Sequence, residues 1–318
     1  MNYDLFNGDA DGICALIQLR LAEPRAAELV TGVKRDVSLV RRLPDTDLDQ
    51  VTVLDVSLDK NRDDVVRVLD RGADVFYCDH HFPGEVPAHE NFDVLIKTDA
   101  NVCTSILINE RLKGAHTPWA IVGAFGDNLD TSAAALARPL DLDVATLDLY
   151  KRLGTYANYN GYGSALEDLH FHPAELFQLM ACYDRPEQFV SEAATSFSRL
   201  ENGYIDDMAQ AAATTPSTEM KEAAVFILPD APWARRVSGV FGNDLAKQHP
   251  DRAHAVLTEK ANGDYLVSVR APLSDKRDAD TICRQFDTGG GRAAAAGINN
   301  LPDSELGRLE QLLSATYG

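Results

Sequence analysis

The sequence predicts an α/β protein of two domains: an N-terminal parallel sheet with helices on both faces, and a smaller C-terminal domain of mixed α/β structure. Three observations predict this fold class. Over residues 1–165, short β-like runs alternate with helical patterns, which is typical of parallel sheets. A polar, proline-bearing stretch, "TTPSTEM" at 214–220, marks a boundary, and a new series of strand and helix patterns follows it. The chain of 318 residues is also long enough to bury two cores.

Along the first domain, four apolar runs rich in β-branched and aromatic residues are predicted strands: "YDLF", "VTVLDVS", "DVFYCD" and "DVLIKTD". Helical patterns follow the first two, at "GICALIQLRLAE" and "NRDDVVRVLDRG". The segment that runs from "PAELFQLM" to "MAQAAA" is also predicted to be helical. We therefore expect a first domain over residues 1–185, a helical connector over 186–222 and a second domain over 223–318.

The second predicted domain opens with the strand "AAVFIL" and the helix "WARRVSGVFGNDLAKQ". The strands "AHAVLTEK" and "DYLVSVRA" follow, joined by the turn signal "ANGD". After the helix "DADTICRQF" comes the glycine-rich "DTGGGRAAAAGINN", and the helix "DSELGRLEQLLSA" closes the series. This order of elements is the basis for a smaller, mixed α/β domain.

Composition excludes several classes of partner. The net charge of −19 argues against a broad phosphate-binding surface, because duplex binding normally relies on a basic face. We expect a short nucleotide or oligonucleotide as substrate and no long duplex. The five cysteines are scattered without CxxC pairs, which fits reduced thiols and a cytoplasmic protein. Neither a signal peptide nor a membrane-spanning stretch is recognisable, so no membrane partner is expected; a homodimer stays open.

Acidic residues stand where the first two predicted strands should end. Asp9 and Asp11, in "FNGDADG", follow the first strand, although the same pattern also suits a turn or a helix start. Asp55 finishes the apolar run "VTVLD", and a carboxylate there must be capped, paired or bound to a metal. In open α/β sheets, ligands bind beyond the carboxyl ends of the strands. We therefore expect these residues to meet at one edge of the sheet.

The stretch "VFYCDHHFPGE" adds Asp79, His80 and His81 after the next strand. Oxygen ligands with one or two imidazoles suit Mn²⁺, Mg²⁺ or a related divalent ion such as Co²⁺, whereas a structural zinc site would have more sulfur. Asp127, in "VGAFGDNLD", supplies another carboxylate, with a helix cap as the alternative. Two metal ions bridged by a carboxylate are a recurrent device for phosphoryl displacement, so the inventory indicates a hydrolase without a covalent intermediate.

The motifs "DADG", "LDVS", "DHH" and "GD", in this order and followed by "GGGRAAAAG", resemble those of the DHH phosphoesterases with a C-terminal DHHA1 domain. The resemblance covers nearly the whole chain. That family is similar to manganese-dependent exonucleases of the RecJ type and to small phosphodiesterases that act on nanoRNA, linear dinucleotides or phosphoadenosine phosphate. It implies a hydrolase with two Mn²⁺ ions in a cleft between the domains, acting on a short nucleotide through an activated water.

The resemblance also implies a role for each residue. Asp9 would bind one metal, Asp11 the other, and Asp55 would bridge them. His80 and Asp127 would complete the shell of the second metal.

Two further roles in the "DHH" motif and one in the second domain follow from the same resemblance. Asp79 would orient His80, and His81 would face the scissile phosphate as a donor, so that Asp55, Asp79 and His81 form the catalytic set. In the second domain, substrate binding is implied for five residues: Arg270, Gly289, Gly290, Gly291 and Arg292. Arg292 stands where the family has histidine, and a guanidinium can still bind phosphate.

The sequence departs from the family at the first metal, because Leu5 stands where many members have histidine and Asn7 where RecJ-like members have an acid. These departures keep a non-catalytic nucleotide-binding protein open as an alternative. A more distant alternative is a haloacid-dehalogenase-like phosphatase, in which Asp9 would be a covalent nucleophile. The stretch that contains Tyr159 and His170 would either stack a base or form a packed connector, and the packed connector is the favoured interpretation.

Overall fold

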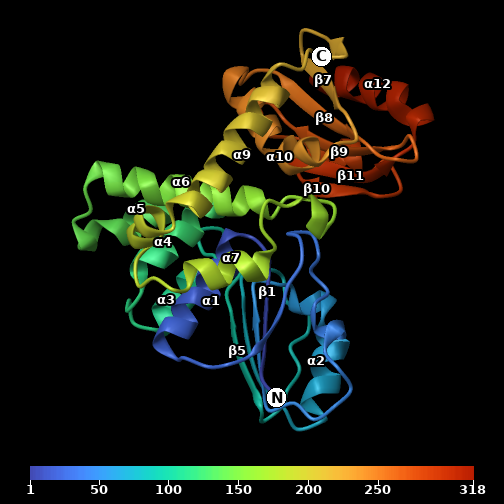
Figure 1. The fold of residues 1–318 in the computed structure, drawn as a ribbon. Helices are drawn as coiled ribbons and strands as arrows, with labels where there is room; N and C mark the ends of the chain where they lie inside the picture. Colours follow the sequence, from blue (N-terminus) through green and yellow to red (C-terminus); the bar gives the residue numbers. More distant parts are fainter. The chain divides into compact units, whose positions relative to one another are not determined.

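The computed structural model describes residues 1–318, which form two compact units, Met1–Asn202 and Gly203–Gly318 (Figure 1). The first contains an all-parallel sheet and the second a mixed sheet, so the predicted fold class is confirmed. The division falls inside helix α9 (Ala194–Ala212), within the expected connector 186–222. Part of that segment therefore belongs to each unit.

The first sheet has five parallel strands in the order β2-β1-β3-β4-β5. Four of them correspond to predicted strands, whereas β2 was not predicted. Because β1 lies between β2 and β3, the chain first adds a strand on one side of β1 and then crosses to the other side. Ligand sites of open α/β sheets lie beyond the carboxyl ends of the strands at such a reversal. The strands are β1 (Tyr3–Phe6), β2 (Glu28–Val30), β3 (Gln50–Leu54), β4 (Asp74–Asp79) and β5 (Phe92–Ile96).

Helices cover both faces of this sheet. Figure 1 shows α2 on one face and α1 with α3 on the other. On the α2 face, Leu5, Val53 and Tyr77 of the sheet form a buried cluster with Val65 and Val68 of the helix. On the other face α1 packs against α4, and both helices are buried along most of their length, so neither needs a polar side.

The helices of the first unit are α1 (Ala10–Ala22), α2 (Arg62–Leu69), α3 (Thr104–Arg111), α4 (Thr117–Gly126), α5 (Asp130–Ala137), α6 (Val144–Asn160), α7 (Pro173–Met180), α8 (Pro186–Glu192) and α9, with single 3₁₀ turns at Val40–Arg42, Leu58–Lys60, Arg138–Leu140 and Leu166–Asp168.

The second unit is built on a six-stranded sheet in the order β10-β11-β9-β8-β7-β6, in which β7 and β8 are parallel and the other pairs antiparallel. The glycine-rich motif forms the hairpin of β10 and β11, which places it at one edge of the sheet. The strands are β6 (Thr218–Glu219), β7 (Ala223–Leu228), β8 (Ala253–Glu259), β9 (Tyr265–Arg270), β10 (Gly289–Arg292) and β11 (Ala295–Leu301). The helices are α10 (Pro232–Gln248), α11 (Ala279–Cys283) and α12 (Leu306–Tyr317), with a 3₁₀ turn at Asp303–Glu305.

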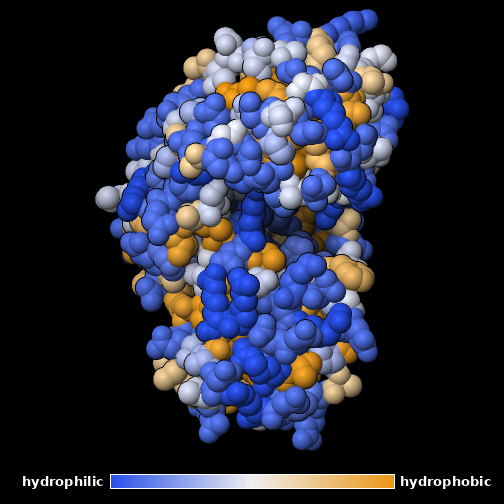
Figure 2. Space-filling model, turned by 90° about the vertical axis from the view of Figure 1, so that its right-hand side faces the viewer, coloured by the Kyte–Doolittle hydropathy of each residue, from blue (hydrophilic) through white to orange (hydrophobic).

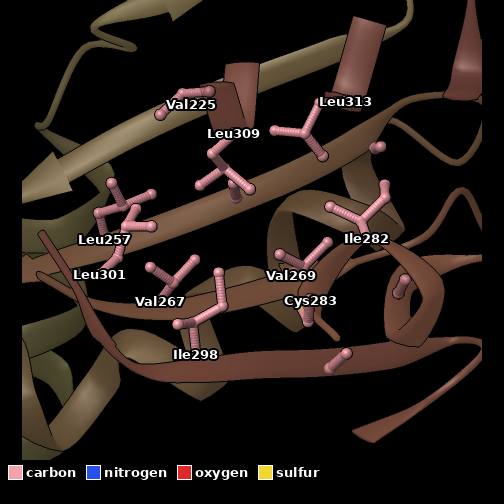
Figure 3. Close-up of a cluster of buried hydrophobic side chains, with 14 of the residues drawn as sticks. Val225, Leu257, Val267, Val269, Ile282, Cys283, Ile298, Leu301, Leu309 and Leu313 are labelled. Atoms are coloured by element: carbon pink, nitrogen blue, oxygen red, sulfur yellow. The ribbon is translucent and has the colours of Figure 1, made fainter. Parts of the chain in front are cut away.

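The core of the second unit lies between one face of this sheet and α12 (Figure 3). Val267 and Val269 of β9 point into it, and Leu309 and Leu313 of α12 pack against them from the helix. Each fully buried aliphatic side chain of this kind contributes about 2 kcal/mol. Because side chains alternate along a strand, Arg270 lies on the opposite face, where it contacts α10.

The face in Figure 2 is mainly hydrophilic, and its hydrophobic residues occur in small separate groups. No helix has both the length and the apolar composition that crossing a bilayer requires.

Candidate metal centre

The carboxyl ends of β1 and β3, next to each other at the reversal of strand order, carry Asp9 and Asp55. Asp9 is the N-cap of α1, and its Oδ1 accepts a hydrogen bond from the Gly12 amide at 3.1 Å. Residue 12 must be glycine, since a Cβ there would overlap the carbonyl oxygen of Asn7. Asp55 directly follows β3 with a φ of 60°, an uncommon left-handed conformation, and its Oδ1 accepts a hydrogen bond from the Thr104 hydroxyl at 3.1 Å.

The carboxylates at this edge repel one another. Asp9, Asp11 and Asp55 are almost completely buried. Burial and the charges of Asp11 and Asp9 raise the pKa of Asp55 well above its usual value. Burial, followed by the charge of Asp11, raises the pKa of Asp127 to about 6. Asp127 is the C-cap residue of helix α4, as the helix-cap alternative expected, but the helix dipole disfavours a negative charge at this end, so the carboxylate does not stabilise the helix. Such a cluster requires positive charge nearby.

His80 is oriented as a metal ligand. Its Nδ1 lies 3.0 Å from the carbonyl oxygen of Val102, and because a carbonyl only accepts, Nδ1 carries the proton. The lone pair of Nε2 is then directed toward the carboxylates, 3.4 Å from Asp55 Oδ1 and 3.9 Å from Asp127 Oδ2. A histidine whose other nitrogen donates to a carbonyl is the usual arrangement at a metal.

Asp79 orients His81 and not His80, so the expected role of Asp79 toward His80 is wrong. Asp79 is fully buried at the end of β4, and its Oδ1 lies 2.7 Å from His81 Nδ1. Burial alone would lower the pKa of His81, but the hydrogen bond and the charge of Asp79 outweigh it and raise that pKa. The sequence could not assign the acid between two adjacent histidines, because the assignment depends on the distant carbonyl of Val102.

The donor set fits a divalent cation. Asp55, His80 and His81 each offer a ligand atom, and these atoms lie within 4.8 Å of one another. Carboxylates with imidazole, without thiolate, favour Mn²⁺ or Mg²⁺ over a structural zinc ion. Two further predicted ligands, Asp9 and Asp127, are linked to each other by Lys34, and Asp127 also lies beside His80.

Lys34, which sequence reasoning missed, lies among these carboxylates. It follows β2, and its Nζ is 2.5 Å from Asp9 Oδ2, 2.9 Å from Asn158 Oδ1 and 3.9 Å from Asp127 Oδ1. The Tyr162 ring centroid is 5.3 Å away. Burial would lower the pKa of Lys34, but the charge of Asp9 outweighs it and raises that pKa well above its usual value. Its position after β2 would have indicated it only if that short strand had been recognised in the sequence.

Asp11 has a different neighbourhood from Asp9. Both of its carboxylate oxygens accept backbone amides of helix α3, from Thr104 and Ser105, each at 2.7 Å. These bonds satisfy two amides at the N-terminus of α3, where a negative charge is favourable. Asp11 is therefore tied to the start of that helix, and its predicted role as a metal ligand stays a prediction.

Leu5 and Asn7, which stand where related proteins have a histidine and an acid, supply neither an imidazole nor a carboxylate to the first metal. Leu5 is fully buried in the core on the α2 side of the sheet. The side-chain amide of Asn7 donates a hydrogen bond to the backbone oxygen of Lys34 at 3.2 Å. The stretch that contains Tyr159 and His170 is a packed connector. Tyr159 is fully buried, and its hydroxyl lies 2.8 Å from His170 Nε2.

In the second unit, strand register aligns the predicted substrate-binding residues. Arg292 pairs with Ala295, which pairs with Arg270, and residues paired in this way project from the same face. The Arg270 guanidinium is held by Asn243 Oδ1 at 2.6 Å and by the Gly239 carbonyl at 3.2 Å, so it is not a solvated surface arginine. Its contact with substrate phosphate stays a prediction.

His254, on β8 beside Arg270, gives the second unit a predicted pH dependence. It is fully buried, and burial, Arg252 and His249 lower its pKa to about 4. An unfolded histidine titrates near 6.5, so the stabilising contribution is complete above that pH and is lost as the pH falls toward 4. Between pH 7 and 5, the melting temperature of the second unit should fall about 5 °C further in the wild type than in His254→Leu. Parallel pH profiles would contradict this.

No protein-family model matches this chain, and no curated protein matches it by sequence. Its structure is similar to that of RecJ in complex with Mn²⁺ from Thermus thermophilus, with a TM-score of 0.67 and 15% identity over 99% of this chain and 51% of that chain. This chain thus spans about half the length of that RecJ.

Two other solved structures are similar over most of their length. One is the DHH domain of a protein described as a member of a family of ribosomal proteins, with a TM-score of 0.66 and 14% identity, covering 99% of this chain and 85% of that chain. The other is the pGpG-specific phosphodiesterase PggH from Vibrio cholerae, with a TM-score of 0.56 and 13% identity over 100% of both chains. The chain has the DHH–DHHA1 fold.

Proposed function

We propose that this protein is a divalent-metal-dependent phosphoesterase, with Mn²⁺ as its ion, that hydrolyses short nucleotide substrates. The observation that carries the proposal is the group of carboxylates and imidazoles around Asp55 and His80, at the reversal of strand order. The similar RecJ structure contains Mn²⁺, and the similar PggH is described as a pGpG-specific phosphodiesterase. Both support this class of reaction.

The residues that would hold an ion are Asp55, His80 and Asp127, with Asp9 on the far side of Lys34. His81 also has a ligand atom within reach of Asp55 and His80, but its Nδ1 is held by Asp79, and we assign it to proton donation. A bound divalent ion supplies Lewis-acid polarisation of the phosphate and lowers the pKa of a water nucleophile. Around it, Thr104 holds the Asp55 carboxylate in place through its hydroxyl. Because the carboxylate is already fixed, it does not have to reorient during the reaction.

His81 is the proton donor in the proposed reaction. Asp79 holds its Nδ1 and raises its pKa, so the imidazolium persists to higher pH and can donate from Nε2 to a phosphate oxygen or leaving group. The His81 side chain is partly exposed, which leaves it accessible to substrate. The Asp79–His81 pair thus provides an oriented acid next to the metal ligands.

The second unit would bind a phosphate of the substrate. Arg292 and Arg270 carry guanidinium groups on one face, separated by the small Ala295 of β11. The exposed Arg292 guanidinium can bind phosphate oxygens bidentately and at any physiological pH, whereas Arg270, held by Asn243 and Gly239, would add mainly its charge. The net charge of −19 disfavours long polyanions, so a dinucleotide, a nanoRNA or phosphoadenosine phosphate suits this surface better than a duplex.

A substrate panel tests the proposal. The wild-type protein is incubated with linear dinucleotides, nanoRNAs, cyclic dinucleotides, phosphoadenosine phosphate and long duplex DNA, with Mn²⁺ or with EDTA, and products are separated by chromatography. We expect hydrolysis of at least one short substrate with Mn²⁺, loss of at least about a hundredfold in rate with EDTA, and no duplex cleavage. Hydrolysis that persists unchanged in EDTA would overturn the metal-dependent mechanism.

A second candidate function is nucleotide binding without turnover. The observation that favours it is Lys34, whose ammonium lies where Asp9 and Asp127 approach each other. In that case nucleotides would bind with measurable affinity in calorimetry, and no member of the panel would be hydrolysed.

A further inference from the structure

The centre contains its own cation. Lys34 Nζ contacts Asp9 Oδ2 at 2.5 Å and Asn158 Oδ1 at 2.9 Å, and lies 3.9 Å from Asp127 Oδ1. Asp127 Oδ2 in turn lies 3.9 Å from His80 Nε2, which is 3.4 Å from Asp55 Oδ1. The ammonium and the free histidine nitrogen therefore approach different oxygens of the Asp127 carboxylate. A divalent ion at His80 and Asp55 does not require Lys34 to move from Asp9.

Hydrogen bonds fix the backbone of Lys34 as well as its ammonium group. The backbone amide of Lys34 donates to the Gly161 carbonyl at 2.8 Å, and its backbone oxygen accepts from the Asn7 side chain at 3.2 Å. Asn158, which contacts the ammonium, belongs to the helix that ends just before Gly161. Two separate segments thus fix the lysine backbone, and Asn158 holds its ammonium beside Asp9.

Charge balance also favours one ion. The charge of Asp11 is opposed by the N-terminus of α3, and that of Asp79 by His81. Three carboxylates then remain, those of Asp9, Asp55 and Asp127. One ammonium with one divalent ion supplies three positive charges, which balances them, whereas a second divalent ion would leave an excess in a buried site.

We infer that the Lys34 ammonium takes the place of one of two divalent ions, so that the chain binds a single ion beside Asp55, His80 and Asp127. Asn7 donates its side-chain Nδ2 to the lysine backbone, and its Oδ1 is buried without a hydrogen-bond partner. In turnover the ammonium supplies fixed positive charge on the Asp9 side. Only that part of the inference rests on the proposed function, because the number of bound ions is independent of hydrolysis.

The test is the number of Mn²⁺ ions bound per chain. Purified protein of residues 1–318, stripped with EDTA and dialysed, is titrated with Mn²⁺ alone, and free ion is measured by electron paramagnetic resonance of aqueous Mn²⁺. We expect the wild type to bind one ion, with the low-temperature spectrum of an isolated ion. Lys34→Met, which removes the charge but keeps much of the side-chain length, should bind two ions with a spin-coupled spectrum.

Two controls separate this effect from a general change of charge. Lys34→Arg keeps the positive charge and should bind one ion, as should Lys276→Met, which removes an exposed lysine of the second unit. Thermal unfolding and circular dichroism check that each variant is folded. If Lys34→Met does not fold, Lys34→Gln, which is also uncharged but keeps a polar group, replaces it.

Each other result is decisive. Two ions in the wild type overturn the inference but leave the proposed function standing, because the lysine would then move away on metal binding. One ion in both the wild type and Lys34→Met also overturns it, since removal of the ammonium should free the position. No bound Mn²⁺ in the wild type would overturn the proposed function together with the inference.

Discussion

Asp55→Asn is expected to lower metal-dependent kcat/KM by at least about a thousandfold, or about 4 kcal/mol of transition-state stabilisation. Asp55 is buried in the centre, with its Oδ1 3.4 Å from His80 Nε2 and hydrogen-bonded to the Thr104 hydroxyl. Asparagine has almost the same shape and tolerates the φ of 60° at this position, so the substitution removes mainly the charge. Steady-state rates with the best substrate of the panel, at saturating Mn²⁺, measure the effect.

The matched control for that variant is Asp63→Asn, which neutralises an exposed acid on α2 away from the centre. Its rate should stay within about twofold of the wild type, as is usual for surface positions. Circular dichroism and melting of both variants exclude unfolding. Retention of more than a tenth of the activity by folded Asp55→Asn would mean that Asp55 does not bind the ion.

Gly289→Ala should destabilise the second unit by about 3 kcal/mol or more, which lowers its melting temperature by about 10 °C. A Cβ at residue 289 would overlap the backbone carbonyl of Cys283, in a helix that cannot move without disturbing the core. The predicted result is a shift of strand β10 and, with it, of Arg292. Scanning calorimetry with separate transitions for the two units measures the loss.

Gly290→Ala is the control on the same strand, because a Cβ at residue 290 meets no atom within 4 Å. It should change the melting temperature of the second unit by less than about 2 °C. Equal destabilisation by Gly289→Ala and Gly290→Ala would show that β10 requires glycine for flexibility and not for the close approach to Cys283.

Most strands could be predicted because their apolar, β-branched runs are strong local signals. β2 could not, because Glu28–Val30 is a strand of three residues and its pairing with β1 alone defines it. The strands β10 and β11 were also not predicted, because glycine and alanine have low strand propensity. This hairpin depends on the pairing of β11 with β9. In both cases tertiary contacts, absent from a local pattern, decide the structure.

The site was predicted to the extent that strands and their ends could be located. Asp9, Asp55 and His80 come together because parallel strands bring their carboxyl ends to one edge. Lys34 was missed for the same reason as β2, since an unrecognised strand has no recognised end. Which histidine Asp79 contacts was not predictable, because that choice is made by side-chain rotamers and a distant backbone carbonyl.

The tie between Asp11 and helix α3 has a consequence for how the first unit opens. Thr104 donates its amide to Asp11 and its hydroxyl to Asp55, and Ser105 donates its amide to Asp11. The first turn of α3 therefore cannot fray without releasing two buried carboxylates that belong to the centre. Occupation of the centre by a cation would protect these two amides from hydrogen exchange, so that helix fraying and metal release become one cooperative event.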